Sequence, residues 1–288
     1  LREAAVTLQQ GGGVGMDFST IRPAGSAVMG VGAEASGPLS FMDTWDAMCR
    51  TIMSAGQRRG AMMGCLRIDH PDIEAFIDAK RDGVRLRNFN LSVLVTDAFM
   101  EALERDGEWT LRHGGKAYRT LPAADLWNRL MRATYDAAEP GVIFVDRVNA
   151  LNNLAEIETI AASNPCGEQM LPPYGACLLG SLNLAQLVAS PFTPEAGLKR
   201  RIGLGITGLA DALIFCGARY GSAEAAALAE GWLETIKQAA YRASARLAAE
   251  KGPYPAFTPS VLDRPNLVGL DREVREMIAT SGLRNACL

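Results

Sequence analysis

The chain has 288 residues, 48% of them hydrophobic, and a formal net charge of −3 at pH 7. This length and composition allow a large core, in one big domain or two small ones. The balanced charge argues against a nucleic-acid surface. No apolar run reaches the roughly 18–20 residues of a membrane span, and no signal peptide opens the chain, so we expect a soluble, cytoplasmic protein.

Six cysteines are spread along the chain, and we expect them to be reduced thiols. They are Cys49, Cys65, Cys166, Cys177, Cys216 and Cys287. None forms a C-x-x-C pair, and the two histidines, His70 and His113, stand apart from each other in the sequence. The pattern therefore predicts neither a metal site nor a disulfide scaffold.

The first 60 residues alternate between predicted helices and glycine-rich loops. Residues 1–10 are predicted as the end of a helix, and residues 41–54 have helical apolar spacing. The glycines of residues 11–15 suit a sharp turn or close approach to a phosphate, although a plain loop is the usual explanation. Residues 20–38 lack any period, which predicts a long ordered loop. Residues 56–60 place two arginines on a loop, as phosphate-binding forks or as a solvated turn.

The rest of the chain alternates strands and helices, which indicates the α/β class. Helices are predicted over residues 72–79, 97–104, 124–138, 223–251 and 271–279. Strands are predicted over residues 88–96 and 141–146, and a hairpin over residues 109–119 turning at Gly114-Gly115.

One short stretch combines an amide, a thiol and a carboxylate. Residues 163–169 read Ser-Asn-Pro-Cys-Gly-Glu-Gln. In an extended segment Asn164, Cys166 and Glu168 would face the same side and line one pocket. A thiol can act as nucleophile or radical carrier, a carboxylate can take a proton, and an amide can orient a ligand. The bland alternative is that Cys166 is a small buried hydrophobe and Glu168 a surface charge.

The longer string N-P-C-G-E-Q followed by L-P-P-Y-G-A-C-L-L-G-S-L-N-L resembles the large catalytic chain of ribonucleotide reductases. In detail it is similar to the adenosylcobalamin-dependent class II enzymes. Four more segments resemble that family in the same order: GGGVGMD, SAGQRRGAMM, NFNLSVLVTD and RIGLGITGLAD. The resemblance implies an incomplete ten-stranded α/β barrel of the ribonucleotide reductase and glycyl-radical type. Residues 1–288 would be a fragment of one catalytic barrel domain, with its N-terminal start and C-terminal remainder missing.

The resemblance also implies the activity, which is reduction of ribonucleoside di- or triphosphates to 2′-deoxyribonucleotides by a thiyl radical. Cys166 would carry the radical and take the 3′ hydrogen, and Glu168 would accept the 3′-hydroxyl proton. Ser163, Asn164 and Glu168 would bind the ribose. Cys177 would be one half of the reducing dithiol, with its partner N-terminal to Leu1.

Regulation and partners are implied in the same way. A deoxynucleoside triphosphate or ATP effector would bind near a homodimer interface, with Arg22 on its phosphates and Gln57, Arg58 and Arg59 sensing its base. Relatives commonly carry a basic residue where this chain has Met29. Adenosylcobalamin would be the cofactor, and a thioredoxin-like reductant would act through cysteines beyond Leu288. Residues 190–200 are shorter than in relatives, as if one helix were deleted.

Three alternatives stay open. The chain could be a class I large subunit, which receives its radical from a separate metal-containing subunit. It could be a non-catalytic nucleotide-binding regulator with structural cysteines. A thiol hydrolase using Cys166 lacks a plausible base, because neither His70 nor His113 has a catalytic context.

Overall fold

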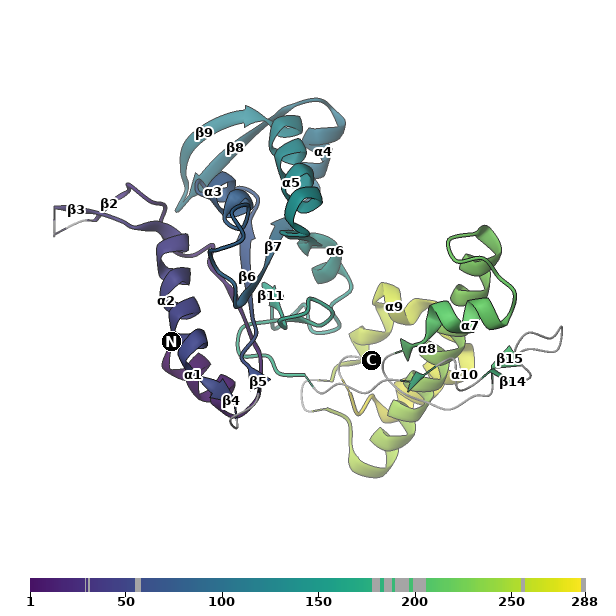
Figure 1. Ribbon diagram of the computed structural model, residues 1–288. Helices are drawn as coiled ribbons and strands as arrows, with labels where there is room; N and C mark the ends of the chain where they lie inside the picture. Colours follow the sequence, from purple (N-terminus) through teal and green to yellow (C-terminus); the bar gives the residue numbers. More distant parts are fainter. Residues whose placement is uncertain are drawn as a thin grey trace. The chain divides into compact units, whose positions relative to one another are not determined.

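The computed structural model describes residues 1–28, 30, 32–54, 58–177, 182–183, 188–189, 197–198, 206–254 and 257–285. These fall into two compact units, of which the first comprises Leu1–Ala150 and Glu158–Ala176. The second comprises Leu151–Ile157 and Cys177–Leu288. Figure 1 colours the chain from its N-terminus to its C-terminus and labels its elements.

A four-stranded parallel sheet forms the centre of the first unit (Figure 1). In spatial order its strands are β1 (Val14–Asp17), β6 (Met62–Arg67), β7 (Phe89–Val95) and β10 (Gly141–Phe144). Helices connect them, as parallel pairing requires. α2 (Gly37–Thr51) lies between β1 and β6, α3 (Ile73–Asp78) between β6 and β7, and α4 (Asp97–Glu104) and α5 (Ala123–Ala137) between β7 and β10. In addition, α1 (Arg2–Gln9) precedes β1 and α6 (Val145–Ala150) follows β10.

Antiparallel strand pairs lie outside this sheet in the first unit. β2 (Ala27–Val28) pairs with β3 (Ala33–Glu34), and β4 (Met53–Ser54) pairs with β5 (Arg58–Arg59). β8 (Glu108–His113) and β9 (Lys116–Pro122) form a hairpin that turns at Gly114 and Gly115, both with positive φ. β11 (Ala162–Ser163) pairs with β12 (Met170–Leu171).

The two faces of the sheet carry different kinds of side chain, because successive residues of a strand point to opposite sides. One face is wholly apolar and packs on the helices. It includes Met62, Leu66, Phe89, Leu91, Val93 and Val95. The other face holds a smaller apolar cluster of Met63, Cys65, Leu94 and Ile143, against which Ala162 and Met170 of the β11–β12 hairpin pack. This second face also bears Asp17, Arg67 and Asn90, since they share its register.

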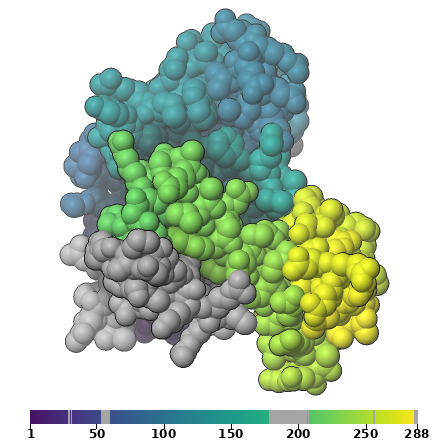
Figure 2. Space-filling model, turned by 90° about the vertical axis from the view of Figure 1, so that its right-hand side faces the viewer, coloured from purple at the N-terminus to yellow at the C-terminus, as the bar shows by residue number. Residues whose placement is uncertain are grey.

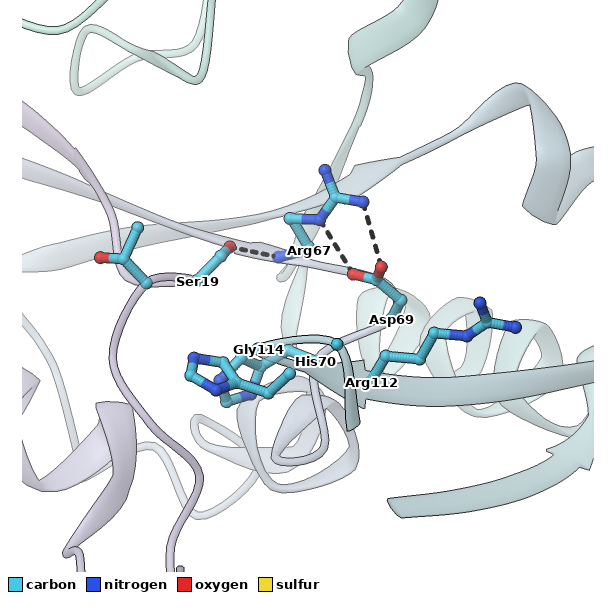
Figure 3. A pocket seen from close by; sticks show the side chains of 9 residues that line it. Ser19, Arg67, Asp69, His70, Arg112 and Gly114 are labelled. Atoms are coloured by element: carbon cyan, nitrogen blue, oxygen red, sulfur yellow. Dashed lines mark hydrogen bonds and ion pairs between the residues drawn. The ribbon is translucent and has the colours of Figure 1, made fainter. Parts of the chain in front are cut away.

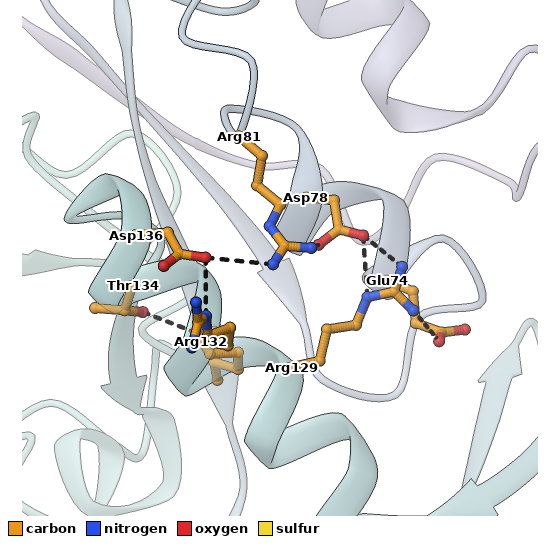
Figure 4. Close-up of polar contacts among 8 residues, drawn as sticks. Glu74, Asp78, Arg81, Arg129, Arg132, Thr134 and Asp136 are labelled. Atoms are coloured by element: carbon orange, nitrogen blue, oxygen red, sulfur yellow. Dashed lines mark hydrogen bonds and ion pairs between the residues drawn. The ribbon is translucent and has the colours of Figure 1, made fainter.

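Ion pairs hold α3 against α5 on the helical side of the sheet (Figure 4). Arg129 of α5 donates to Glu74 and Asp78 of α3. Arg81, just after α3, reaches Asp136 at 3.4 Å. The guanidinium groups are at least one-third exposed, so each pair adds little stability and mainly fixes how the two helices align.

A better-buried pair ties the start of β7 to the turn before β10. Glu139 accepts Lys80 Nζ at 2.9 Å through one carboxylate oxygen and the backbone N–H of Leu91 at 3.0 Å through the other. Lys80 also donates to the carbonyl of Phe89. Its side chain is 15% exposed and that of Glu139 24%, so this pair is less screened than those of α3 and α5.

The second unit is mainly helical. Its helices are α7 (Leu209–Phe215), α8 (Ala223–Lys251), the 3₁₀ helix η2 (Pro259–Asp263), α9 (Pro265–Val268) and α10 (Arg272–Ser281). α8 and α10 lie side by side (Figures 1 and 2) around a core that includes Tyr241, Leu267 and Ile278. Ser222 caps α8 by accepting the N–H of Ala225.

Short strand pairs and a linker complete the second unit. β13 (Leu182–Asn183) pairs with β16 (Ile206–Thr207), and β14 (Val188–Ala189) pairs with β15 (Gly197–Leu198). The segment 151–157 is held through Glu156, which accepts hydrogen bonds from Ser260 and Arg264.

Most predicted elements are confirmed, including the helices over residues 72–79, 97–104, 124–138 and 223–251 and the hairpin turning at Gly114-Gly115. Three expectations are corrected. The helix expected over residues 41–54 is present but spans Gly37–Thr51, and the strand expected over residues 141–146 is present but ends at Phe144. Residues 20–38, expected as a loop, contain the β2–β3 pair. The stretch 190–200, where we expect a helix to be deleted, lies largely outside the described residues. Among the helices that are described, none is long and apolar enough to cross a membrane.

Replacing Glu139 by alanine should destabilise the chain by about 2–3 kcal/mol, because Lys80 and the Leu91 N–H would lose a charged partner. Urea unfolding followed by circular dichroism measures this. The matched control is Glu101→Ala, which removes an exposed pair with Arg105 and should change stability by about 0.5 kcal/mol or less. Equal effects of the two substitutions would contradict the role assigned to Glu139.

Burial raises the pKa of the Cys65 thiol from 9.0 to about 12, and the Asp17 carboxylate adds to the rise. The folded state therefore keeps this proton at pH values where the unfolded chain loses it. The contribution of Cys65 to stability is fully present below pH 9 and should fall by about 1.4 kcal/mol per pH unit above it. The difference in unfolding free energy between the native chain and Cys65→Ser should be constant from pH 7 to pH 8.5 and change only above pH 9. A difference that is flat up to pH 11 would contradict this.

Candidate active site

The sequence motif forms the loop of the β11–β12 hairpin, over residues 164–169. Asn164 closes the loop with its backbone and its side chain. Its N–H donates to Gln169 O at 3.1 Å, its Oδ1 accepts the Gln169 N–H at 3.0 Å, and its carbonyl accepts the Gly167 N–H at 3.1 Å. The loop is therefore a compact turn, and the expected alternation of side chains along an extended segment does not apply.

Two features of the sequence make this turn possible. Gly167 has φ of +87°, which an L side chain rarely adopts. Pro165 fixes its own φ near −65° and lacks the N–H that the turn would leave unpaired. Ser163 at the base is 1% exposed, and its hydroxyl donates to the carbonyl of Asn164.

The loop lies directly on two glycines at the start of β1. A Cβ built on Gly15 would be 1.6 Å from the carbonyl oxygen of Ser163, and one built on Gly13 would be 2.3 Å from Cγ of Pro165. Either contact is impossible, so no other residue fits without moving the loop. The close approach expected at the glycine run therefore occurs, but its partner is the motif itself.

Side chains of β6 and β7 also contact the underside of the loop. The Cys65 thiol is fully buried and receives the backbone N–H of Ser163. Met63 lies under Gly167, with Cε 3.6 Å from where a Cβ would be. Asn90 Nδ2 donates to the carbonyl of Pro165 at 2.6 Å. Sequence reasoning missed these three residues, although a polar Asn90 in an otherwise apolar strand was a usable signal.

The reactive side chains of the motif are on the free side of the loop. Cys166 and Glu168 are both exposed, whereas Cys49 and Cys65 are buried. Burial raises the pKa of Cys49 as well, with a further contribution from Asp46. Of the buried and exposed thiols of the first unit, Cys166 is thus the one that a ligand can reach.

The other predicted site residues lie elsewhere. Cys177 is exposed and belongs to the second unit, so its position relative to Cys166 is not defined. Arg22 is exposed in the connection after β1, next to Ile21, whose carbonyl bonds His70 Nε2 at 2.9 Å. Arg58 and Arg59 form β5, and Gln57, Met29 and Cys287 lie outside the described residues.

A separate pocket of about 390 Å³ lies at the carboxyl ends of β1 and β6, the opposite strand ends from the motif loop (Figure 3). Arg67 makes a two-point pair with Asp69 there, at 2.9 and 3.0 Å. His70 is 2% exposed, and burial lowers its pKa. Both its ring nitrogens are occupied, by Ile21 O and the Asp72 N–H. The polar groups of Arg67, Asp69 and His70 are therefore engaged with protein partners, and Arg112 and His113 also line the pocket.

No group of three His, Cys, Asp or Glu side chains within the described parts of the chain is arranged to hold a metal ion. The arrangement that remains is an exposed thiol and an exposed carboxylate, two positions apart, on a loop anchored to a parallel sheet. Such a loop can present a sulfur and a proton acceptor to the same ligand.

Comparison with known proteins agrees with this picture. The chain matches the family described as ribonucleotide reductase, barrel domain, over residues 1–198 and 192–288. It is 41% identical to a vitamin B12-dependent ribonucleoside-diphosphate reductase of Mycobacterium tuberculosis (strain CDC 1551 / Oshkosh), an alignment that covers 90% of this chain and 42% of the relative.

Two further relatives are more distant. A vitamin B12-dependent ribonucleoside-diphosphate reductase of Thermoplasma acidophilum is 34% identical, over 93% of this chain and 39% of the relative. A vitamin B12-dependent ribonucleotide reductase of Streptomyces avermitilis is 30% identical, over 89% and 33% respectively. The chain thus spans less than half the length of these relatives. With its family model matched along its whole length, the chain belongs to the ribonucleotide reductase barrel-domain family.

Proposed function

We propose that this chain carries the radical loop of an adenosylcobalamin-dependent ribonucleotide reductase. The observation that carries the proposal is the exposed Cys166 thiol at the tip of a loop fixed to a parallel sheet. The names of the relatives, vitamin B12-dependent ribonucleoside-diphosphate reductases, support the cofactor and favour diphosphate substrates.

In the proposed reaction Cys166, as a thiyl radical, removes the hydrogen at C3′ of the ribose, so that an S–H bond forms and a C–H bond breaks. Glu168 accepts the 3′-hydroxyl proton while the 2′-hydroxyl leaves as water. A dithiol that includes Cys177 supplies two electrons and two protons, one proton to the departing 2′-hydroxyl and one to C2′, and ends as a disulfide. Glu168 returns its proton to the 3′ oxygen. The S–H hydrogen of Cys166 then returns to C3′.

Hydrogen bonds within the loop limit which atoms of Asn164 and Ser163 can contact the substrate. Oδ1 of Asn164 is used to close the loop, which leaves its side-chain NH₂ to donate to a ribose hydroxyl. Ser163 is buried, so we assign it to holding the loop through its hydroxyl, with substrate contact limited to its backbone. Both assignments keep the sugar oriented against the sulfur, where misplacement by about 1 Å is costly.

The thiols of the first unit fit a radical cofactor. Adenosylcobalamin, when bound, would supply the radical that is passed to a cysteine. Cys166 is exposed to receive it, while Cys65, although close to the loop, is buried and keeps its proton with a pKa of about 12. The site therefore offers one reachable sulfur.

The finer features of the family are part of the proposal. We infer a ten-stranded barrel, of which β1, β6, β7 and β10 supply four strands. Arg22, with Gln57, Arg58 and Arg59, would bind a deoxynucleoside triphosphate or ATP effector near a homodimer interface. A thioredoxin-like reductant would renew the dithiol in the cytoplasm.

Replacing Cys166 by serine in the full-length enzyme should abolish deoxynucleotide formation, because a serine O–H bond is too strong to give up its hydrogen to the cofactor radical. Chromatography of the products, with adenosylcobalamin and a dithiol but no second subunit, measures this. The matched control, Cys216→Ser, changes a partly exposed cysteine of the second unit and should retain activity. Product from the Cys166 variant, or native activity only with a metal-containing subunit, would contradict the proposal.

A further inference from the structure

One hydrogen bond joins the motif loop to the side chain of a residue in the sheet. Among the bonds between described residues, only that from Asn90 Nδ2 to Pro165 O, at 2.6 Å, links residues 164–169 to a side chain outside the β11–β12 hairpin. The remaining bonds of the loop lie within the hairpin: they are made by Asn164, whose carbonyl also accepts the Ser163 hydroxyl. The placement of the loop tip on the sheet therefore depends on Asn90.

The accepting oxygen belongs to the peptide that joins Pro165 to Cys166. That peptide is planar, so holding its oxygen also sets the direction of the Cys166 N–H and the position of its Cα. The pyrrolidine ring fixes φ of Pro165 on one side. On the other side, the Gly167 N–H is held by Asn164. Little freedom remains to Cys166 beyond rotation of its own side chain.

Packing below the loop forces the carbonyl towards Asn90. Pro165 rests on Gly13 of the connection into β1, where a side chain would clash. Asn90 stands level with Met63 in the β6–β7 register, and Met63 supports Gly167. The loop thus touches three neighbouring parts of the sheet, and Asn90 makes the one directional contact among them.

We propose that Asn90 is a positioning residue for Cys166, fixing the peptide that precedes the cysteine so that its sulfur is held at the distance needed for hydrogen transfer. This inference rests on the proposed function for its catalytic meaning. Asn90 touches neither sulfur nor substrate in this assignment. It acts only through the Pro165 carbonyl.

The test uses Asn90→Asp and Asn90→Ala in the full-length enzyme. Aspartate keeps the shape but turns an oxygen towards the Pro165 carbonyl, so it separates the loss of the donor from the loss of bulk. Both variants should lower kcat by about 10- to 100-fold with KM little changed, since the substrate still binds but the sulfur is misplaced.

A second readout is independent of the reaction. Amide hydrogen exchange, followed by mass spectrometry, should rise in peptides covering residues 164–169 and stay unchanged in β6 and β7. The matched control is Asn88→Ala, which removes an asparagine next to the same strand that bonds Asp46 of α2 instead. It should leave kcat and loop exchange as in the native enzyme.

The outcomes separate the two proposals. Native-like kcat in Asn90→Asp, or unchanged exchange in the loop, overturns the positioning role. Exchange that rises equally throughout the sheet also overturns it, because Asn90 would then be merely structural. If the native enzyme makes no deoxynucleotide, the proposed function fails, and the exchange result alone decides whether Asn90 holds the loop.

Discussion

The contact between the backbone of residues 163–165 and the two glycines beside it is the constraint on which the site depends. At Gly15 the Ser163 carbonyl occupies the space of a Cβ, and at Gly13 the Pro165 ring does so. The loop can be this close only because the sheet has no side chains at these points. Closeness in turn lets short groups such as the Asn90 amide and the Cys65 thiol reach the loop backbone.

Alternate residues of each strand serve different purposes: one face of the sheet packs in the core, and the other supports the motif loop. Even-numbered positions of β6 and odd-numbered positions of β7 face the helices and are all apolar. The alternate positions face the motif loop and mix small, polar and sulfur-containing side chains. Substitutions on the first face should therefore alter core packing and stability. Substitutions on the second face should first alter the position of Cys166.

Much of the first unit follows from the sequence, because its helices have clear apolar periods and its hairpin has a Gly-Gly turn. β6 was missed for a physical reason. Residues 62–66 of its Met-Met-Gly-Cys-Leu-Arg run are buried on both faces and so show no alternation, and the run contains no β-branched residue. The motif was found by its residues, but its shape was not, since Asn164 uses its side chain to make a turn that strand periodicity cannot anticipate.

The order β1-β6-β7-β10 leaves β1 and β10 as the outer strands of the described sheet. An outer strand exposes backbone donors and acceptors that another polypeptide can use. In β10, Gly141 and Val142 are half-buried and Phe144 is exposed, which makes this border apolar as well as open. At each of these two borders of the described sheet a second chain could add a strand, and such edge-to-edge association would increase with protein concentration.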